Sequence, residues 1–245
     1  MRKRRFCRID KNGCVACGGR TFEQRAIIND ALASAWGLST RERADLDERE
    51  GNACANCHIS KRVRMLLWSI RRLFPGSSGL RVIHFNQINH LSPALRTLGD
   101  VTQTCHQQGL ERGAKVGELV NEDICELTFP NNHFDLAIHS ETLEHLFDFS
   151  KALREVERVL RPGGVQIYTL PLLHNRSTRQ RMRQGADGCM VHLLPPSYHG
   201  NEGEFPVVWE FGGDFFQQRK LNINELHYDN YWQNRTVFTV VERKP

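Results

Sequence analysis

The chain has 245 residues, of which 40% are apolar and 25% are charged, so a packed core is expected and wholesale disorder is excluded. This length suits one medium domain, or a domain with a small module. The apolar stretches are far shorter than the ~18–20 residues that cross a bilayer, and none follows the basic start of the chain. We therefore expect a cytoplasmic protein with no membrane span.

The net charge of +5 is unevenly distributed along the chain. Residues 1–75 have a net charge of +8, whereas the remainder has a net charge of −3. A basic module attached to a mildly acidic body can indicate an anionic partner, of which nucleic acid is one kind.

Two Cys-x-x-Cys pairs, Cys14/Cys17 and Cys54/Cys57, lie in the basic part, with 36 residues between them. Each pair can present two sulfurs to one ion, and two pairs complete a tetrahedral set of four thiolates, which suits structural zinc. Gly18 follows the first pair and permits the positive φ that turns backbone amides toward the sulfurs. The spacing therefore predicts a zinc site.

Other interpretations of the cysteines stay open. The pairs could be redox-active or disulfide-bonded, or the thiols could be unrelated buried groups. Cys7 and His58 lie close enough in sequence to replace one zinc ligand. The three remaining cysteines are isolated and are interpreted as small core residues; they are Cys105, Cys125 and Cys189.

A helix is predicted from Lys61 to Phe74, because apolar residues recur at helical spacing while arginines occupy the other face. That basic face is either the solvated side of a helix joining two domains or a surface for nucleic acid. Residues 75–79 end the helix. We predict a cysteine-rich zinc-binding module with its connecting helix over residues 1–75 and a second domain over 80–245.

Strands and helices alternate in the second domain. Strands are predicted at 81–85, 101–105, 134–139 and 165–170, with helices at 92–98 and 151–160 between them. Ser92 and Ser150 are the expected N-caps of the two helices. This alternation predicts an α/β fold with a parallel, doubly wound sheet, which binds its ligand at the carboxyl ends of the strands.

Two stretches of this domain carry a resemblance. Residues 127–145 read LTFPNNHFDLAIHSETLEH, and residues 153–164 read LREVERVLRPGG. Both resemble the class I S-adenosylmethionine-dependent methyltransferases, and in particular the methyltransferase type 11-like subgroup. The match is specific over 123–171. The resemblance implies a Rossmann-like seven-stranded sheet, bound S-adenosyl-L-methionine and transfer of its methyl group to an acceptor.

The cofactor motifs of that family match unevenly. Its glycine-rich first turn is replaced by residues 86–90, which contain no glycine, and Thr104 stands where an acid usually holds the ribose. Asp123 matches the acid near the adenine. The resemblance assigns these residues to cofactor binding: Phe85, Asn86, Gln87, Asn89, Thr104, Asp123, Ile124, His139, Ser140 and Glu141.

Two functions fit this mixture. The first is a methyltransferase acting on an unidentified acceptor, either a small molecule or a macromolecule, for which an anionic compound is one option. The alternative is a zinc-containing nucleic-acid-binding or regulatory protein with a degenerate, non-catalytic methyltransferase fold. Glu144 and His145 are interpreted as structural in preference to catalytic.

A substrate-side insertion is predicted at about residues 171–215. Its first part contains four arginines and no acid, so it is either a grip for an anion or a solvated helical face. The residues expected to face the acceptor are His174, Arg176, Arg179 and Tyr198. His199 is the candidate general base, with a loop-bracing hydrogen bond as the other interpretation.

Overall fold

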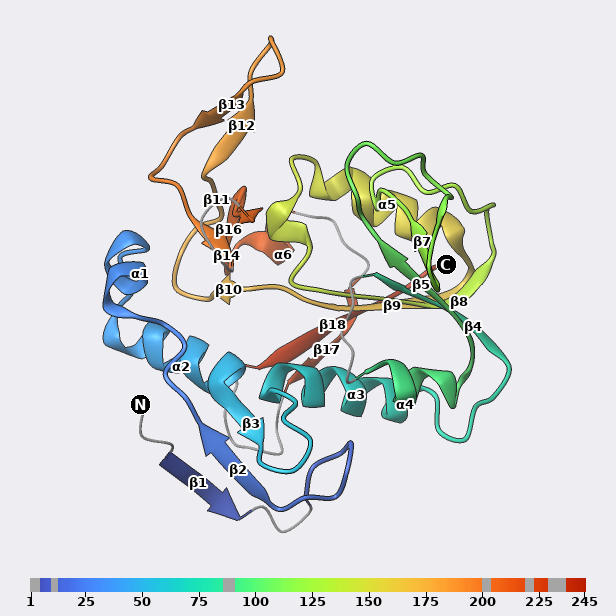
Figure 1. The fold of residues 1–245 in the computed structure, drawn as a ribbon, viewed down its shortest axis with the longest axis horizontal. Coiled ribbons are helices and arrows are strands. Elements are labelled where there is room, and N and C mark those ends of the chain that lie inside the picture. The colour runs from blue at the N-terminus through green and yellow to red at the C-terminus, as the bar shows by residue number, and fades with distance from the viewer. Residues whose placement is uncertain (1–4, 10–12, 86–90, 200–203, 219–222, 229–236) are drawn as a thin grey trace. The chain divides into compact units, whose positions relative to one another are not determined.

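The computed structural model describes residues 5–9, 13–85, 91–199, 204–218, 223–228 and 237–245 (Figure 1). The chain divides into two compact units. The first consists of Met1–Ser78, Ile88–Leu98 and Leu226–Val240, and the second of Gly79–Gln87, Gly99–Glu225 and Val241–Pro245. No helix among the described residues is long and apolar enough to cross a membrane.

The N-terminal part of the first unit is a three-stranded antiparallel sheet with helices. The strands are β1 (Arg5–Ile9), β2 (Thr21–Gln24) and β3 (Asn52–Cys54), paired in that order. Helices α1 (Asp30–Ala35) and α2 (Thr40–Gly51) fill the interval between the two cysteine pairs. Ser39 and Glu42 form a reciprocal capping box that starts α2.

The predicted helix after the second pair is α3 (Lys61–Leu73), which Ser60 caps by accepting a hydrogen bond from the amide of Val63. The basic residues of its first turn are held within the unit, whereas Arg71 and Arg72 in its last turn are exposed. Lys61 is 2% exposed and pairs with Glu48 at 2.9 Å, and the guanidinium of Arg62 pairs with Glu50 at 2.9 Å. These pairs neutralise much of the face that the sequence offered as a surface for nucleic acid.

Arg64 is also engaged by contacts inside the first unit. Its guanidinium donates to the side chain and the carbonyl of Asn52 and to the carbonyl of Ile59, and it lies 4.5 Å from the centre of the Phe22 ring. A buried guanidinium of this kind is stabilised by its oxygen acceptors and by the face of the aromatic ring. Arg64 therefore belongs to the core of the first unit.

The largest sheet is the predicted doubly wound sheet, whose strands β4 to β9 belong to the second unit. Its strands are β4 (Leu80–Phe85), β5 (Gly99–Cys105), β6 (Lys115–Val116), β7 (Leu119–Asn121), β8 (Phe134–Ser140), β9 (Leu160–Thr169), β17 (Ile223–Tyr228) and β18 (Phe238–Arg243). Their order is β17-β18-β9-β8-β4-β5-β7-β6. The pairs β4–β5, β4–β8, β5–β7 and β8–β9 are all parallel. Apart from the two-residue edge strand β6, this is the expected seven-stranded Rossmann-like sheet.

The strand order reverses at β4, because the chain adds β5 and β7 on one side and β8 and β9 on the other. The carboxyl ends of β4 and β8 therefore border the crevice at which doubly wound sheets bind ligands. Helix α5 (Phe149–Val159) connects β8 to β9 and buries Ala152, Leu153 and Val156 (Figure 1).

Both predicted helix caps were wrong by one or two residues. Helix α5 is capped by Asp148, whose carboxylate accepts from the amide of Lys151, and Ser150 lies inside the first turn. A carboxylate at this position also interacts favourably with the helix dipole, which explains the preference over serine. In α4 (Ser92–Arg96) the N-cap is Leu91, with no side-chain cap.

The segment after β9 folds as short strands and turns. Strands β10 (Leu172–Leu173), β16 (Trp209–Gly212) and β11 (Arg179–Gln180) form one small sheet. Strands β12 (Met182–Gln184) and β13 (Met190–His192) form one hairpin, and β14 (Tyr198–His199) and β15 (Phe205–Pro206) form another. A short helix, α6 (Phe215–Gln218), follows. The arginine-rich stretch thus lies on short strands and bends, and the helical interpretation was wrong.

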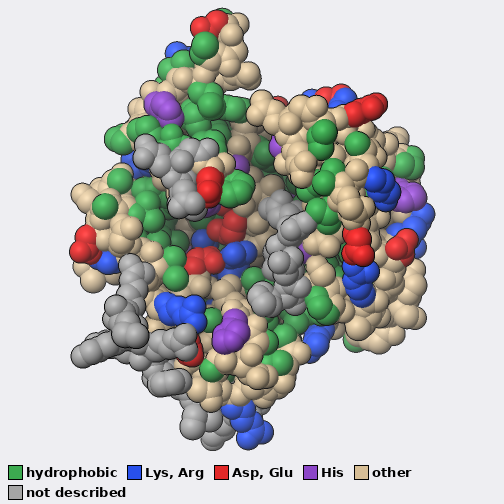
Figure 2. Space-filling view, in the orientation of Figure 1, with side chains coloured by type: hydrophobic (Ala, Val, Ile, Leu, Met, Phe, Trp, Pro, Cys, Tyr) green, Lys and Arg blue, Asp and Glu red, His purple; other side chains and the backbone are tan. Residues whose placement is uncertain are grey.

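Aromatic contacts attach this insertion to α5. The ring of Phe149 lies 5.3 Å from Trp209, 5.2 Å from Phe211 and 5.9 Å from Phe215. By contrast, the β12–β13 hairpin projects from the small sheet (Figure 1), and Figure 2 shows hydrophobic side chains in green on its surface. Met190 and Leu193 are exposed there. Cys189 is exposed in this hairpin as well, so its interpretation as a core residue was wrong.

Candidate functional site

The residues that the resemblance assigned to the cofactor lie at one edge of the second unit's sheet. Phe85 ends β4 and pairs with Thr104, which lies one residue before the end of β5. Ser140 ends β8, next to Thr169 at the end of β9. Because these strands are parallel and adjacent, their carboxyl ends meet at one edge. Asn86, Gln87 and Asn89 fall outside the described residues.

The β8 end of this edge is closely packed. His139 is fully buried, and its ring stacks on Tyr168 with the ring centres 4.6 Å apart. The hydroxyl groups of Ser140 and Thr169 lie 2.5 Å apart, and Thr169 donates to the carboxylate of Glu141 at 3.0 Å. Glu141 has a φ of +51°, which turns the chain sharply away from the sheet. His139 therefore supports the edge from within the core, while Ser140 and Glu141 form its polar rim.

The other side of the edge is formed by the turns after β5 and β7. Thr104 is 3% exposed, and Ile124 is 7% exposed. The carboxylate of Asp123 accepts a hydrogen bond from the amide of Cys125, which fixes the turn. Asn121 was not singled out from the sequence, yet it accepts from the amide of Gln107 at 2.7 Å. Asn121 thereby ties the turn after β5 to the end of β7.

The two stretches that carried the resemblance are joined by Arg158. Its guanidinium donates to the carbonyls of Leu127 and Phe129 and to the side chain of Asn131, at 2.8–2.9 Å. It also pairs with Glu155, and this hydrogen bond lowers the pKa of the Glu155 carboxyl. Spacing alone did not reveal this contact, which joins the two stretches in the fold.

A polar cluster lies just beyond the end of β8. Leu143–His145 form a single 3-10 turn, η1. The Nδ1 atom of His199, in β14, lies 3.6 Å from a carboxylate oxygen of Glu144 and 3.1 Å from Nε2 of His145. Glu144 is fully buried, whereas the imidazoles are partly accessible. The structure therefore brings the candidate base next to two residues that were interpreted as structural.

His145 is held by a backbone contact. Its Nδ1 lies 2.8 Å from the carbonyl oxygen of Pro206, so Nδ1 carries the proton in the neutral ring and Nε2 presents its lone pair to His199. Burial lowers the pKa of His145, against the opposing effect of the Pro206 carbonyl and the charge of Glu141. The contact with Pro206 thus defines the tautomer of the neutral ring.

The arginines of the insertion have acidic partners. Glu210, in β16, pairs with both Arg179 and Arg181, and Arg181 is only 2% exposed. Because Glu210 lies about thirty residues further along the chain, the local sequence around the arginines shows no acid. His174 is exposed, and Arg176 and Tyr198 are partly exposed. Arg179 and Arg181 thus help to hold the insertion together through their ion pairs with Glu210.

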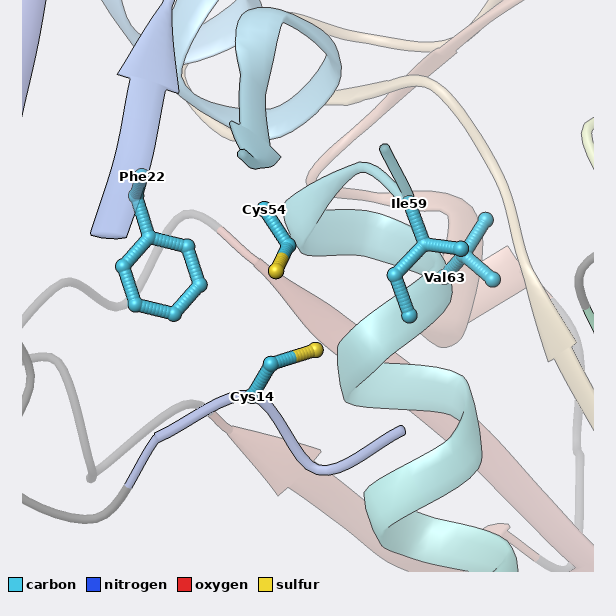
Figure 3. Close-up of a cluster of buried hydrophobic side chains, with 5 residues drawn as sticks. All are labelled: Cys14, Phe22, Cys54, Ile59 and Val63. Atoms are coloured by element: carbon cyan, nitrogen blue, oxygen red, sulfur yellow. The ribbon is translucent and has the colours of Figure 1, made fainter. Parts of the chain in front are cut away.

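The four paired cysteines lie together in the first unit. Their sulfurs are all within 4.8 Å of one another, with Cys14–Cys57 at 3.7 Å and Cys17–Cys54 at 3.6 Å. A tetrahedral zinc site with Zn–S bonds of about 2.3 Å places its sulfurs about 3.8 Å apart. Figure 3 shows the sulfurs of Cys14 and Cys54 pointing toward each other among Phe22, Ile59 and Val63.

The two Cys-x-x-Cys turns have the same backbone geometry. Gly18 has a φ of +73° and its amide donates to the carbonyl of Cys14, while His58 has a φ of +60° and its amide donates to the carbonyl of Cys54. A side chain on Gly19 would lie 3.2–3.3 Å from the sulfurs of Cys54 and Cys17. His58 is exposed and lies outside the cluster, and the side chain of Cys7 lies outside the described residues.

Comparison with known proteins gives a match for the central part of the second unit. Residues 84–168 match a family model described as a methyltransferase domain. This segment is therefore similar to methyltransferase domains. It runs from the end of β4 into β9 and contains most of the edge described above, with Thr169 just beyond it.

Relatives of known name agree with this assignment. The ubiquinone/menaquinone biosynthesis C-methyltransferase UbiE of Escherichia coli is 30% identical over 103 residues, which are 40% of this chain and 40% of that protein. The protein of the same name from Shigella boydii matches to the same extent. The match thus spans about two-fifths of the length of these relatives.

Two solved methyltransferase structures match this chain at low sequence identity. An S-adenosylmethionine-dependent methyltransferase from Mesorhizobium loti is 15% identical and has a TM-score of 0.44, over 73% of this chain and 97% of that one. The phosphoethanolamine N-methyltransferase 2 of Haemonchus contortus, in complex with S-adenosyl-L-methionine, is 21% identical with a TM-score of 0.34, over 43% and 27% of the two chains.

Proposed function

We propose that the protein is a methyltransferase that transfers a methyl group from S-adenosyl-L-methionine to an acceptor held on the insertion side of the sheet. The main support is that residues 84–168, which match the methyltransferase family model, include the carboxyl ends of the parallel strands that form the polar edge. The alternative of a non-catalytic nucleic-acid-binding protein has less support, because Lys61, Arg62 and Arg64 are engaged inside the first unit.

In this proposal the cofactor binds along the carboxyl ends of β5, β4 and β8. Thr104, Asp123 and Ile124 line one side, and Ser140 and Glu141 line the other. Phe85 and His139 support the edge from below, since both are buried and their rings meet edge to face. Asn86, Gln87 and Asn89 complete the site in place of the usual glycine-rich turn. The bound cofactor supplies a methyl group on a positively charged sulfur.

The acceptor side consists of the cluster beyond β8 and the insertion. Glu144 lies four residues after Ser140, so the cluster borders the cofactor edge. His199 is proposed as the group that contacts the acceptor, with His174, Arg176, Arg179 and Tyr198 around it. Methyl transfer requires in-line placement of the acceptor atom, and much of the rate can come from this positioning.

The cysteine cluster is proposed to be a structural zinc site with Cys14, Cys17, Cys54 and Cys57 as ligands. The fit of the sulfur distances and the matched turns support it. Burial raises the pKa of the Cys14 thiol, whereas at Cys17 the desolvation is outweighed by hydrogen bonds from Asn56 and Gly19, which lower the pKa of that thiol to about 6. A zinc ion would hold them as thiolates and leave no open position for chemistry.

Calorimetric titration with S-adenosyl-L-methionine and with its demethylated product tests the function directly. We expect binding in the micromolar range, weakened at least tenfold in Glu141→Lys, because this change would place a cation beside the sulfonium. Glu118→Lys, on the turn between β6 and β7, is the control and should bind normally. Absence of binding at millimolar ligand by the folded protein would refute the proposal.

A further inference from the structure

The three side chains beyond β8 have the composition of a metal site. Glu144 offers a carboxylate oxygen, and His145 and His199 each offer a ring nitrogen. The three ligand atoms form a compact triangle with edges of 3.1, 3.6 and 3.7 Å. Two imidazoles and one carboxylate are a ligand set that zinc and other divalent transition metals use when one or more positions stay open.

The size of the triangle fits one ion. A tetrahedral zinc ion with bonds of about 2.1 Å to nitrogen and oxygen places its ligand atoms about 3.4 Å apart. The three observed edges lie on either side of this value, so a single ion above the triangle can reach all three atoms without rearrangement of the backbone.

The surroundings orient the ligands as metal sites require. The Nδ1–H group of His145 donates to the Pro206 carbonyl, which leaves Nε2 deprotonated and directed toward Glu144 and His199. Such a contact on the second ring nitrogen is the usual means by which proteins fix a metal-binding histidine. Pro206 and His199 come from the paired strands β15 and β14, so one hairpin supplies both a ligand and an orienting group.

The cysteine cluster differs from this triangle in its number of ligands. Four thiolates close a tetrahedral site, whereas three ligands leave a fourth position for water or substrate. Glu144 is fully buried, while the ring of His199 is 33% exposed, so the accessible side of the triangle is the histidine side.

We propose that Glu144, His145 and His199 bind a divalent transition-metal ion, with zinc as the first choice, whose open position takes an oxygen of the methyl acceptor. Binding of the ion stands on this geometry alone, whereas the role of the open position rests on the proposed methyltransferase function. The acceptor class is an alcohol, phenol or enol, because these present an ionisable oxygen to the cation.

The chemical step balances without any further reactant. The acceptor hydroxyl loses its proton to solvent, and the cation stabilises the oxyanion. A lone pair of that oxygen forms the bond to the methyl carbon, while the bond from this carbon to the sulfonium sulfur breaks and its electron pair stays on sulfur. His199 acts in this scheme as a ligand and not as a free base.

Metal analysis of the full chain tests the proposal. The protein is loaded with zinc, freed of excess metal and analysed by atomic emission. We expect a second equivalent of zinc beyond the cysteine-bound one, lost in Glu144→Gln and in His199→Gln. His192→Gln removes an exposed histidine of β13 and should retain both equivalents.

Titration with cobalt(II) identifies the second site in the unmodified protein. Cobalt on the cysteines gives intense sulfur-to-metal charge transfer, so an equivalent that binds with weak d–d bands alone supports the nitrogen and oxygen site. If zinc and cobalt stop at one thiolate-bound equivalent, the proposal is wrong and the short His145–His199 distance is a direct hydrogen bond.

Binding of the demethylated cofactor separates this proposal from the function. We expect His199→Gln to bind it within about threefold of the unmodified protein, since the cofactor edge is intact. A second metal equivalent in a protein that binds no cofactor would support the metal site and refute the methyltransferase proposal alone.

Discussion

The two ligand clusters of this protein are assembled in opposite ways. In the cysteine cluster each half comes from one short turn, and the two turns repeat the same φ and the same hydrogen bond. In the cluster of Glu144, His145 and His199, adjacent residues of one turn meet a histidine 54 residues further along the chain. The first cluster depends on local geometry and the second on the placement of a hairpin. Closed sites of local origin stabilise a fold, whereas open sites made by distant segments are free to hold a substrate.

The largest effect on stability should come from removal of the proposed zinc ion. We expect Cys54→Ser combined with Cys57→Ser to abolish metal binding there and to unfold the cysteine-containing part of the first unit, because structural zinc contributes most of the folding free energy of such modules. Circular dichroism and limited proteolysis measure this loss. Cys105→Ser is the control, and a metal-free protein of unchanged stability would contradict a zinc site.

The hairpin-bearing insertion should depend strongly on its buried ion pair. Arg181→Ala leaves the buried carboxylate of Glu210 with only Arg179 as its cation, and we expect a loss of about 3 kcal/mol in the free energy of unfolding. Arg183→Ala, at an exposed position of β12, should change stability by less than about 0.5 kcal/mol. Urea denaturation compares the two. Equal effects would indicate that Arg181 is free to grip an anionic acceptor.

Acid should weaken the second unit through His84. Burial lowers the pKa of this histidine in β4 to about 4, below its usual 6.5. The neutral ring therefore contributes fully above pH 6.5, and stability falls as the pH drops from 6.5 to 4, by about 3 kcal/mol in all. His84→Leu should remove most of this dependence in urea titrations between these pH values. His192→Leu, an exposed change, should leave the slope as it is.

The smallest effects test the equivalence of the two cysteine turns. Gly18→Ala should destabilise by about 1 kcal/mol, because no atom lies within 4 Å of the added methyl group and the positive φ alone opposes it. His58→Gly should stabilise by up to about 1 kcal/mol for the same reason. Thermal unfolding of the zinc-loaded protein measures both. Shifts of the same sign would show that the turns are not equivalent.

Local patterns made much of the structure predictable. The parallel strands, α3, α5 and the cysteine pairs were all visible as short-range spacing, and the positive φ at Gly18 followed from its place in the turn. The caps were harder, since Asp148 and Ser150 are both good capping residues and the sequence does not show which of them accepts the helix amide.

Long-range contacts explain what the sequence did not reveal. Residues 176–183 looked like an anion grip because Glu210, their partner, is remote in sequence. Glu144 and His145 looked structural because nothing near them in sequence points to His199. The Pro206 carbonyl that orients His145 belongs to the backbone, for which a sequence pattern has no signal.

The position of β18 has a consequence for synthesis on the ribosome. This strand follows all others of its sheet in the chain, yet it lies between β17 and β9, where Glu242 accepts hydrogen bonds from Gln166 and Tyr168. Strand β17 is therefore synthesised before β18, with which it pairs. Gln166 and Tyr168 of β9 gain their hydrogen bonds to Glu242 only after β18 has been synthesised. Until β18 has left the exit tunnel, the nascent sheet ends at β9 with an unpaired edge. Such an edge is prone to aggregation, and it is the kind of surface that chaperones protect.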